Sequence, residues 1–287
     1  MYEGKRRFWR RGLLAGLICV CGVLGACAAA PERGAAVTAD AHARLLAAVN
    51  GAHRSAANRA RDPYRHPVET LEFFGIAPDM EVVELWPFGG WYTEILAPYL
   101  RDHGVYYAAA MDPDTATAEE QRYNDDLETL FSTRPDLYSK VRMSVLARGR
   151  MEIAPPGTAD LVVSFRNIHN WVWADMEKDV FAAAFRALKP GGVLGIVEHR
   201  HPDPDFEPRL PGQGYVGEDY AVRLIEAAGF RLVGRSGIND NPRDTKDYPH
   251  GVWTLPPTFA EGARDRAKYA AIGESDRFTL KFVKPEQ

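Results

Sequence analysis

Cysteine is scarce in this chain, and so is concentrated positive charge. The 287 residues include three cysteines, Cys19, Cys21 and Cys27, which all lie near the amino terminus. A folded domain that begins at or after Cys27 can therefore form no internal disulfide and no cysteine-ligated zinc site. The rest of the sequence has no internal repeat, and its longest low-complexity tract is the alanine-rich stretch 28–39.

The formal net charge is −4, and it becomes −8 when residues 1–26 are left out, because that segment carries five basic residues and one acidic residue. An acidic domain without a cluster of lysine and arginine is poorly suited to nucleic acid, whose phosphates require positive charge. We therefore expect a small-molecule substrate or an envelope component, and no nucleic acid. The remaining chain, about 260 residues, is long enough for one α/β domain with a sizeable core.

The first 26 residues have the layout of a secretory signal peptide. Basic residues within 5–11 precede the apolar run Leu13–Leu24, which is short for a membrane span. The segment ends in Leu24-Gly25-Ala26-Cys27, which resembles the lipobox of bacterial lipoproteins. The resemblance implies cleavage before Cys27 and acyl chains on Cys27, which would anchor the protein on the periplasmic side of a membrane. Ala28, in the next position, favours the outer membrane.

Two other interpretations of this segment stay open. An ordinary signal peptide could be cut at a nearby alanine, or the segment could remain as an uncleaved anchor. The pair Arg10-Arg11 also loosely fits a twin-arginine export signal.

A strand, a glycine-containing turn and a helix follow one another between residues 81 and 100. Glu81–Leu85 is a short apolar strand that has Glu84 close to its end, and Thr93–Leu100 has a helical pattern. Such a unit can hold a nucleotide, because glycine lets the backbone approach a ligand and the N–H groups at the helix start point at it. A second strand, Val105–Met111, ends at Asp112, where a carboxylate can accept the hydroxyls of a ribose.

Strands and helices alternate along the rest of the chain. Further strands are expected at Val141–Leu146, Leu161–Phe165, Val193–Glu198, Arg231–Arg235 and Phe278–Val283. Helices are expected at Pro67–Phe74, Ala118–Leu130, Met176–Leu188 and Glu218–Ala228. The pattern predicts an α/β fold with a Rossmann-like, doubly wound, seven-stranded sheet. The sheet should be mostly parallel, with an antiparallel last strand, because no strongly periodic helix precedes that strand.

One string carries a family resemblance. Leu188-Lys189-Pro190-Gly191-Gly192, followed by an apolar strand, closely resembles the start of the fifth strand in class I S-adenosylmethionine-dependent methyltransferases. Glu84, Gly89-Gly90 and Asp112 match the order and spacing of that family. The resemblance implies a methyltransferase-like domain at 61–287, preceded by a linker and N-terminal helices at 27–60. It also implies S-adenosylmethionine as cofactor and methyl transfer as activity. Gly89-Gly90-Trp91-Tyr92-Thr93 further resembles a bacterial subgroup of exported methyltransferases.

The chain departs from that family in its first motif, which is acidic-x-Gly-x-Gly-x-Gly. Aligned on Glu84, the glycine positions hold Trp86, Phe88 and Gly90. Either Pro87 reshapes the turn, or the two aromatic side chains fill part of the pocket. The resemblance implies that the cofactor is bound by Glu84, Trp86, Pro87, Gly89, Gly90, Tyr92, Thr93, Asp112 and Arg166. Tyr64, Arg65 and His66 could cover the cofactor from the N-terminal side or could serve as helix-capping residues.

The loop after the fourth strand supplies candidate catalytic residues. In the family this loop lies beside the transferable methyl group, and here it contains Asn167 and His169. Asn167 could bind a polar acceptor group, and His169 could act as a general base or as a structural hydrogen-bonded residue. His199 follows the fifth strand and is expected at the rim of the acceptor pocket. Glu198-His199-Arg200-His201 could form half of a metal site, but no second cluster supports it, so we expect no metal.

A non-catalytic binding protein is the alternative function, because a fold does not fix an activity. Trp86 and Phe88 favour this alternative, whereas Glu84 and Asp112 favour the enzyme. Trp253, between Gly251 and Pro256, is interpreted as a packed anchor of its loop.

Overall fold

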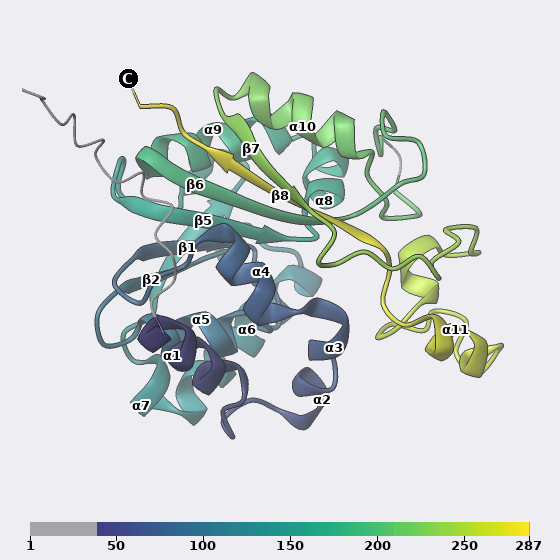
Figure 1. The fold of residues 1–287 in the computed structure, drawn as a ribbon, viewed down its shortest axis with the longest axis horizontal. Helices are drawn as coiled ribbons and strands as arrows, with labels where there is room; N and C mark the ends of the chain where they lie inside the picture. The colour runs from purple at the N-terminus through teal and green to yellow at the C-terminus, as the bar shows by residue number, and fades with distance from the viewer. Residues whose placement is uncertain (1–38, 210, 287) are drawn as a thin grey trace, which may run out of the picture. The chain divides into compact units, whose positions relative to one another are not determined.

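A mixed sheet of eight strands organises the computed structural model, which describes residues 39–209 and 211–286. In chain order the strands are β1 (Glu81–Leu85), β2 (Val105–Ala110), β3 (Arg142–Ala147), β4 (Arg150–Glu152), β5 (Ala159–Phe165), β6 (Leu188–His199), β7 (Arg231–Ser236) and β8 (Arg277–Val283). Their order across the sheet is β4-β3-β2-β1-β5-β6-β8-β7, and Figure 1 labels the strands from β2 to β7 in this order. The order reverses between β1 and β5, so the sheet is doubly wound as predicted.

The sheet has eight strands rather than the predicted seven and has a second antiparallel strand, whereas the antiparallel direction predicted for the last strand is confirmed. β8 does pair antiparallel, with both β6 and β7. The additional strand is β4, which also runs antiparallel and pairs with β3. It has three residues and follows β3 through a tight turn at Gly149, whose φ is 78°. A strand of this length has too few residues to produce a recognisable alternation of apolar and polar side chains.

Helices pack on both faces of the sheet (Figure 1). One face is covered by α1 (Ala39–Val49), α4 (Pro67–Phe74) and α5 (Thr93–Leu100), and the other by α8 (Ile168–Trp173), α9 (Glu177–Ala187) and α10 (Glu218–Ala227). The remaining helices are α2 (Ala56–Arg59), α3 (Asp62–Arg65), α6 (Ala118–Thr133), α7 (Pro135–Tyr138), the 3-10 helix η1 (Gly251–Thr254) and α11 (Arg266–Ile272). The stretch 27–60, predicted as linker and N-terminal helices, thus includes α1, whose Leu45 is buried in the same core as α5.

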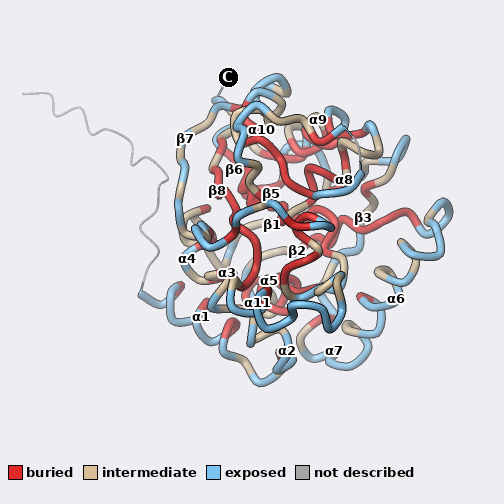
Figure 2. The backbone as a smooth tube through the Cα atoms, turned by 90° about the vertical axis from the view of Figure 1, so that its right-hand side faces the viewer, coloured by how far each residue is buried: buried red, intermediate tan, exposed pale blue. Residues whose placement is uncertain are grey.

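The core consists of two apolar clusters, one on each face of the sheet. In β1, Val82 belongs to one cluster and Val83 to the other, which is the pattern of a central parallel strand covered on both sides. Figure 2 shows the buried residues concentrated along the strands, with exposed residues on the surrounding helices and loops.

The chain between β7 and β8, residues 237–276, forms a separate lobe at the right of Figure 1. We call it the β7–β8 segment. It contains η1 and α11 and has a small core of its own, built on Tyr248, Leu255 and Tyr269.

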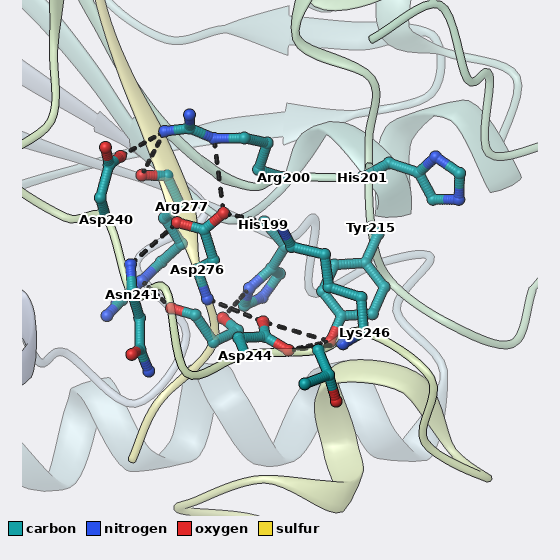
Figure 3. Close-up of polar contacts among 12 residues, drawn as sticks. His199, Arg200, His201, Tyr215, Asp240, Asn241, Asp244, Lys246, Asp276 and Arg277 are labelled. Atoms are coloured by element: carbon teal, nitrogen blue, oxygen red, sulfur yellow. Dashed lines mark hydrogen bonds and ion pairs between the residues drawn. The ribbon is translucent and has the colours of Figure 1, made fainter. Parts of the chain in front are cut away.

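A polar network fixes this segment to the end of β6 (Figure 3). Asp276 accepts hydrogen bonds from Asn241 N at 2.9 Å and from Lys246 Nζ at 2.8 Å. Asp244 accepts hydrogen bonds from Tyr215 Oη at 3.0 Å and from Asp276 N at 2.8 Å. Asn241 and Lys246 belong to the segment itself, whereas Tyr215 and Arg200 lie outside it. Arg200, directly after β6, donates its N–H to Asp276 O at 3.0 Å, so the network holds the segment against the sheet.

Within the described part of the chain, no helix has the length and apolar character that crossing a membrane requires. The predicted signal peptide, residues 1–26, and the predicted lipidation site Cys27 lie outside the described residues.

Candidate functional site

Two adjoining cavities lie at the carboxyl ends of β1 and β5, where the strand order reverses. Ligands of open α/β sheets bind at this position. Cavity 1 has a volume of about 770 Å³ and cavity 2 about 230 Å³. Four residues line both cavities: Trp86, Phe88, Phe165 and Arg166. A ligand that occupied both would therefore pass along these four side chains.

The turn after β1 keeps a backbone shape that glycine favours, although aromatic residues occupy it. Trp86 and Phe88 have φ values of 47° and 48°, and Gly90 has 75°. Side chains other than glycine rarely adopt this left-handed conformation, which costs about 1–2 kcal/mol per residue. Pro87 thus does not replace the glycine-like turn with another shape. At Gly90 a Cβ atom would lie 2.8 Å from Leu130 Cδ2, which explains why glycine remains there.

The side chain of Trp86 is part of the core, and it is 8% exposed. Its Nε1 donates a hydrogen bond to the carbonyl oxygen of Leu146, in β3, at 2.7 Å. Its ring packs edge-on against Trp171, with 6.0 Å between the ring centres. Trp86 therefore reaches from the end of β1 towards the end of β3 and fills space along the carboxyl edge of the sheet.

Cavity 2 contains an arginine with unused hydrogen-bonding capacity. Arg65 is 2% exposed, and its Nη1 and Nη2 atoms have no hydrogen-bond partner among the described residues. Its Nε lies 3.1 Å from Glu274 Oε2, and its guanidinium stacks over the ring of Trp91 at 4.5 Å. Arg61, which also lines the cavity, donates to Glu274 Oε1 at 2.6 Å. Buried donors without partners are rare, so an anionic ligand would complete this site.

Glu84 lies on the wall of cavity 2 and is 3% exposed. Its Oε2 accepts hydrogen bonds from Tyr106 Oη at 2.5 Å and from Thr93 Oγ1 at 3.1 Å. Burial raises the pKa of Glu84 to about 7, and the two hydrogen bonds oppose this rise only in part. The carboxyl group therefore titrates near neutrality and responds to the charge of whatever enters the cavity.

The other residues predicted to bind the cofactor fall into two groups. Pro87, Gly89, Tyr92 and Arg166 line cavity 2 together with Glu84 and Trp86. Gly90, Thr93 and Asp112 do not line it. Thr93 supports Glu84, as described, and Gly90 packs against α6.

Asp112 is buried behind an arginine at the end of β2. Its Oδ1 accepts a hydrogen bond from Arg150 Nη1 at 3.1 Å and one from Asp114 N at 3.2 Å. Its neighbour Met111 lines cavity 1. A ribose hydroxyl that bonded to Asp112 Oδ1 would therefore compete with the exposed side chain of Arg150.

His169 lines cavity 1, and a buried glutamate fixes its orientation. Its Nδ1 lies 3.2 Å from Glu198 Oε1, and Glu198 is completely buried. Glu198 also accepts hydrogen bonds from Ile168 N at 2.6 Å and from His199 N at 2.8 Å. A carboxylate beside Nδ1 holds the proton on that nitrogen, which leaves Nε2 free to accept a proton. Nε2 has no hydrogen bond to any described residue.

His199 lines the same cavity beside His169, with 5.6 Å between the ring centres. Its Nδ1 lies 2.5 Å from Ser275 Oγ, in the β7–β8 segment. Burial lowers the pKa of His199 well below its usual value, and the nearby His169 and Arg166 add to this effect. His199 is therefore neutral at pH 7 and can serve as a hydrogen-bonding group.

Asn167 has a different position from the one its predicted role requires. It does not line either cavity, and its Nδ2 donates hydrogen bonds to Leu85 O at 2.9 Å and to Ser164 Oγ at 3.2 Å. These contacts join the ends of β1 and β5, so its side chain positions the loops that form the cavities. Among the described residues, no three His, Cys, Asp or Glu side chains come together as a metal site.

Trp253 lines cavity 1 together with Trp173, whereas its sequence context indicates only a packed anchor of its loop. The two rings lie 5.7 Å apart, and each also contacts the ring of His169. Val252 N donates to Gln213 O at 2.9 Å, which fixes η1 and so places Trp253. A tryptophan between a glycine and two prolines carries no local signal for such a contact.

No family model and no curated protein matches this chain. The fold, however, is similar to solved structures. A SAM dependent methyltransferase from Aquifex aeolicus has a TM-score of 0.52 and 15% sequence identity, covering 85% of this chain and 98% of that one. The [4+2]-cyclase SpnF has a TM-score of 0.51 and 16% identity, covering 86% of this chain and 94% of that one. These likenesses establish the Rossmann-like methyltransferase fold. One of the two proteins is named for a cyclisation, so the fold alone does not identify the reaction.

Proposed function

We propose that this protein binds S-adenosylmethionine across the two cavities and transfers its methyl group to an acceptor in cavity 1. The observation that carries the proposal is that Nη1 and Nη2 of Arg65 have no hydrogen-bond partner among the described residues. Arg65 lines cavity 2 together with Glu84, next to the cavity that holds His169. The amino-acid part of the cofactor has one carboxylate and one ammonium group. Arg65 can pair with the carboxylate and Glu84 with the ammonium group, because both residues are buried and line the cavity.

The remaining residues fit the other parts of the reaction. S-adenosylmethionine, when bound, supplies a methyl group that its sulfonium activates. Nε2 of His169 would accept a proton from the acceptor, and Glu198 would stabilise the imidazolium that results. The aromatic side chains of cavity 1 would exclude water from the acceptor. On the α6 side, the adenosine would lie beside Met111 and Tyr123, which line cavity 1, and a ribose hydroxyl at Asp112 Oδ1 would compete with Arg150.

Binding of the demethylated cofactor tests the proposal. S-adenosylhomocysteine would be titrated by calorimetry into the full-length chain, purified in mild detergent, and into its Arg65→Met variant. We expect micromolar binding to the parent, because pockets of this kind hold drug-sized ligands. One charge-assisted hydrogen bond contributes about 1.5–3 kcal/mol, so the variant should bind about 10- to 150-fold more weakly.

Arg44→Met is the matched control, because Arg44 lies on the exposed side of α1 and pairs only with Asp40. Equal affinity of the Arg65 and Arg44 variants would refute the assignment of cavity 2. Absence of binding to a folded parent protein would refute the proposed function itself.

The buried ring of Trp86 supports a second candidate, a non-catalytic binding protein on the same scaffold. In that case the aromatic residues of the first turn would close the cofactor site. Phe88→Gly separates the two candidates, because it relieves a left-handed φ and removes one shared wall of the cavities. Binding of S-adenosylhomocysteine to this variant, together with no binding to the parent, would favour the second candidate.

We also propose that the protein is lipid-anchored through Cys27 on the periplasmic side, at the outer membrane. The lipobox-like Leu24-Gly25-Ala26-Cys27 and Ala28 support this location. Cells that express the parent chain and its Cys27→Ser variant would be labelled with a radioactive fatty acid. We expect label on the parent only. Equal label on both would exclude this site, and label on neither would leave an ordinary signal peptide or an uncleaved anchor.

A further inference from the structure

Aromatic rings dominate the part of cavity 1 that surrounds His169. Trp173, Trp253 and His169 form a triangle of rings, in which the ring centres of the two tryptophans lie 5.0 Å and 5.9 Å from that of His169 and 5.7 Å from each other. Phe165 and Trp86 form the wall that is shared with cavity 2. Both Trp173 and Trp253 are half-buried, so their rings are available to a ligand. Rings arranged in this way favour a flat, apolar ligand, because stacked and edge-to-face contacts add to the gain from burial.

The charges of cavity 1 do not favour a cation. Among its described lining residues, the acidic ones are Glu119 and Glu120, at the start of α6. Glu119 is exposed, and Glu120 accepts a hydrogen bond from Thr117 N at 2.7 Å, within a capping box. Neither lies deep in the cavity. Arg166, in contrast, lines the wall, and its guanidinium has no hydrogen bond to a described residue. An anion, or a group that becomes one during the reaction, is therefore favoured at this position.

The base, His169, further restricts the chemical class of the methyl acceptor. A phenol is among the more acidic hydroxyl groups, so a neutral imidazole beside a cation can act as its general base. An aliphatic hydroxyl is far less acidic and would need a stronger base.

We infer that cavity 1 binds a flat aromatic compound with a phenolic hydroxyl, and that this hydroxyl is the methyl acceptor. The inference rests on the proposed function for its methyl donor. In the reaction the phenolic O–H bond breaks and Nε2 of His169 takes the proton. The oxygen forms a bond to the methyl carbon, and the electron pair of the broken carbon–sulfur bond goes to sulfur. The products are an aryl methyl ether and S-adenosylhomocysteine, and His169 then releases its proton to water.

Three probes distinguish the acceptor classes. The full-length chain, saturated with S-adenosylhomocysteine, would be titrated with 2-naphthol, with its fully saturated analogue decahydro-2-naphthol, and with phenyltrimethylammonium. Calorimetry would measure affinity, and quenching of tryptophan fluorescence would show contact with the rings. We expect 2-naphthol to bind about tenfold more tightly than the saturated alcohol, because it gains two ring contacts. Equal binding of the two alcohols, or tighter binding of the cation, would overturn the inference.

Trp253→Leu tests the ring contacts directly, since leucine keeps an apolar wall without an aromatic face. We expect it to weaken binding of 2-naphthol about tenfold and to leave the saturated alcohol nearly unchanged. Trp173→Leu provides a second variant with the same expectation. Phe206→Leu is the control, because Phe206 stacks on His201 and lines neither cavity. Equal losses for both alcohols in the two tryptophan variants would contradict a specific ring contact.

The same titrations separate this inference from the proposed function. If S-adenosylhomocysteine binds and 2-naphthol does not, the acceptor class is wrong and the proposed function stands. If the chain fails to bind S-adenosylhomocysteine but still prefers 2-naphthol through Trp253, the aromatic site stands and the methyl transfer fails. If both bind, mixing 2-naphthol with S-adenosylmethionine should yield 2-methoxynaphthalene, and His169→Gln should slow its formation by about 100-fold or more. An unaffected rate in that variant would overturn the role of the phenolic proton.

Discussion

Replacing Glu84 by glutamine should change how stability depends on pH. Glutamine keeps the hydrogen-bonding partners Thr93 and Tyr106 but carries no proton that titrates. In the folded protein, burial raises the pKa of Glu84 from 4.5 to about 7. In the unfolded chain the carboxyl group loses its proton near its ordinary pKa. Between these two values the unfolded chain therefore binds fewer protons than the folded protein, and stability falls as the pH rises.

The size of the effect follows from the width of that range. At about 1.4 kcal/mol per pH unit, a pKa raised from 4.5 to about 7 corresponds to about 3 kcal/mol. The Glu84→Gln variant lacks this loss, so its free energy of unfolding should exceed that of the parent by an amount that grows between pH 4.5 and 7. Above pH 7 the difference should stay constant, because both states of the parent are then ionised.

Urea unfolding at pH 5, 6, 7 and 8 would measure the difference. Glu81→Gln is the control, since Glu81 lies at the other end of β1 and is half-buried. Parallel stability curves for the parent and the Glu84 variant would refute the reasoning. The same ionisation should affect ligand binding, because a ligand ammonium in cavity 2 favours the charged carboxylate. The affinity of the parent for S-adenosylhomocysteine should therefore rise as the pH passes through 7, and that of the variant should not.

Two further predictions concern residues around cavity 1. His199 is buried in its neutral form with a lowered pKa, so stability should fall as the pH drops below about 6.5, where the unfolded chain takes up a proton that the folded protein cannot. Urea unfolding at pH 5 and 7 should show a smaller fall for His199→Gln, and an equal fall would contradict this. Trp86→Phe removes the donor to Leu146 O and should lower the free energy of unfolding by about 1–3 kcal/mol. An unchanged urea midpoint in that variant would mean that the hydrogen bond contributes nothing net.

Local sequence signals predicted the central elements well. The structure has α4, β1 and α5 at the residues that the sequence predicted. Each has an apolar pattern of the right period, and Gly75, in the left-handed conformation, ends α4 as expected. The carboxyl ends of parallel strands share one edge of the sheet. From this rule the sequence also predicted that Glu84 and His169 lie in the same region.

Features that depend on distant contacts were not predictable in this way. β6 begins at Leu188 rather than Val193, because Leu188 pairs with Ala159 and Gly191 N bonds to Lys284 O. Local periodicity does not show such pairing. The lack of hydrogen-bond partners for Nη1 and Nη2 of Arg65 also depends on where Glu274 and Trp91 lie in the folded chain. The left-handed φ of Trp86 is unexpected for a different reason, since aromatic residues seldom adopt it.

The β7–β8 segment leaves and rejoins the sheet at neighbouring positions, because Ser236 pairs with Thr279 in the antiparallel β7–β8 ladder. It is continuous in sequence, has its own small core and supplies Trp253 to cavity 1. Arg65 and Glu84, in contrast, lie more than 150 residues earlier in the chain. The segment can therefore be exchanged as a cassette between related proteins, by evolution or by design. Such an exchange would alter which acceptor is recognised. It would leave the cofactor half of the site intact only if the new segment kept Glu274, which pairs with Arg61 and Arg65 in cavity 2.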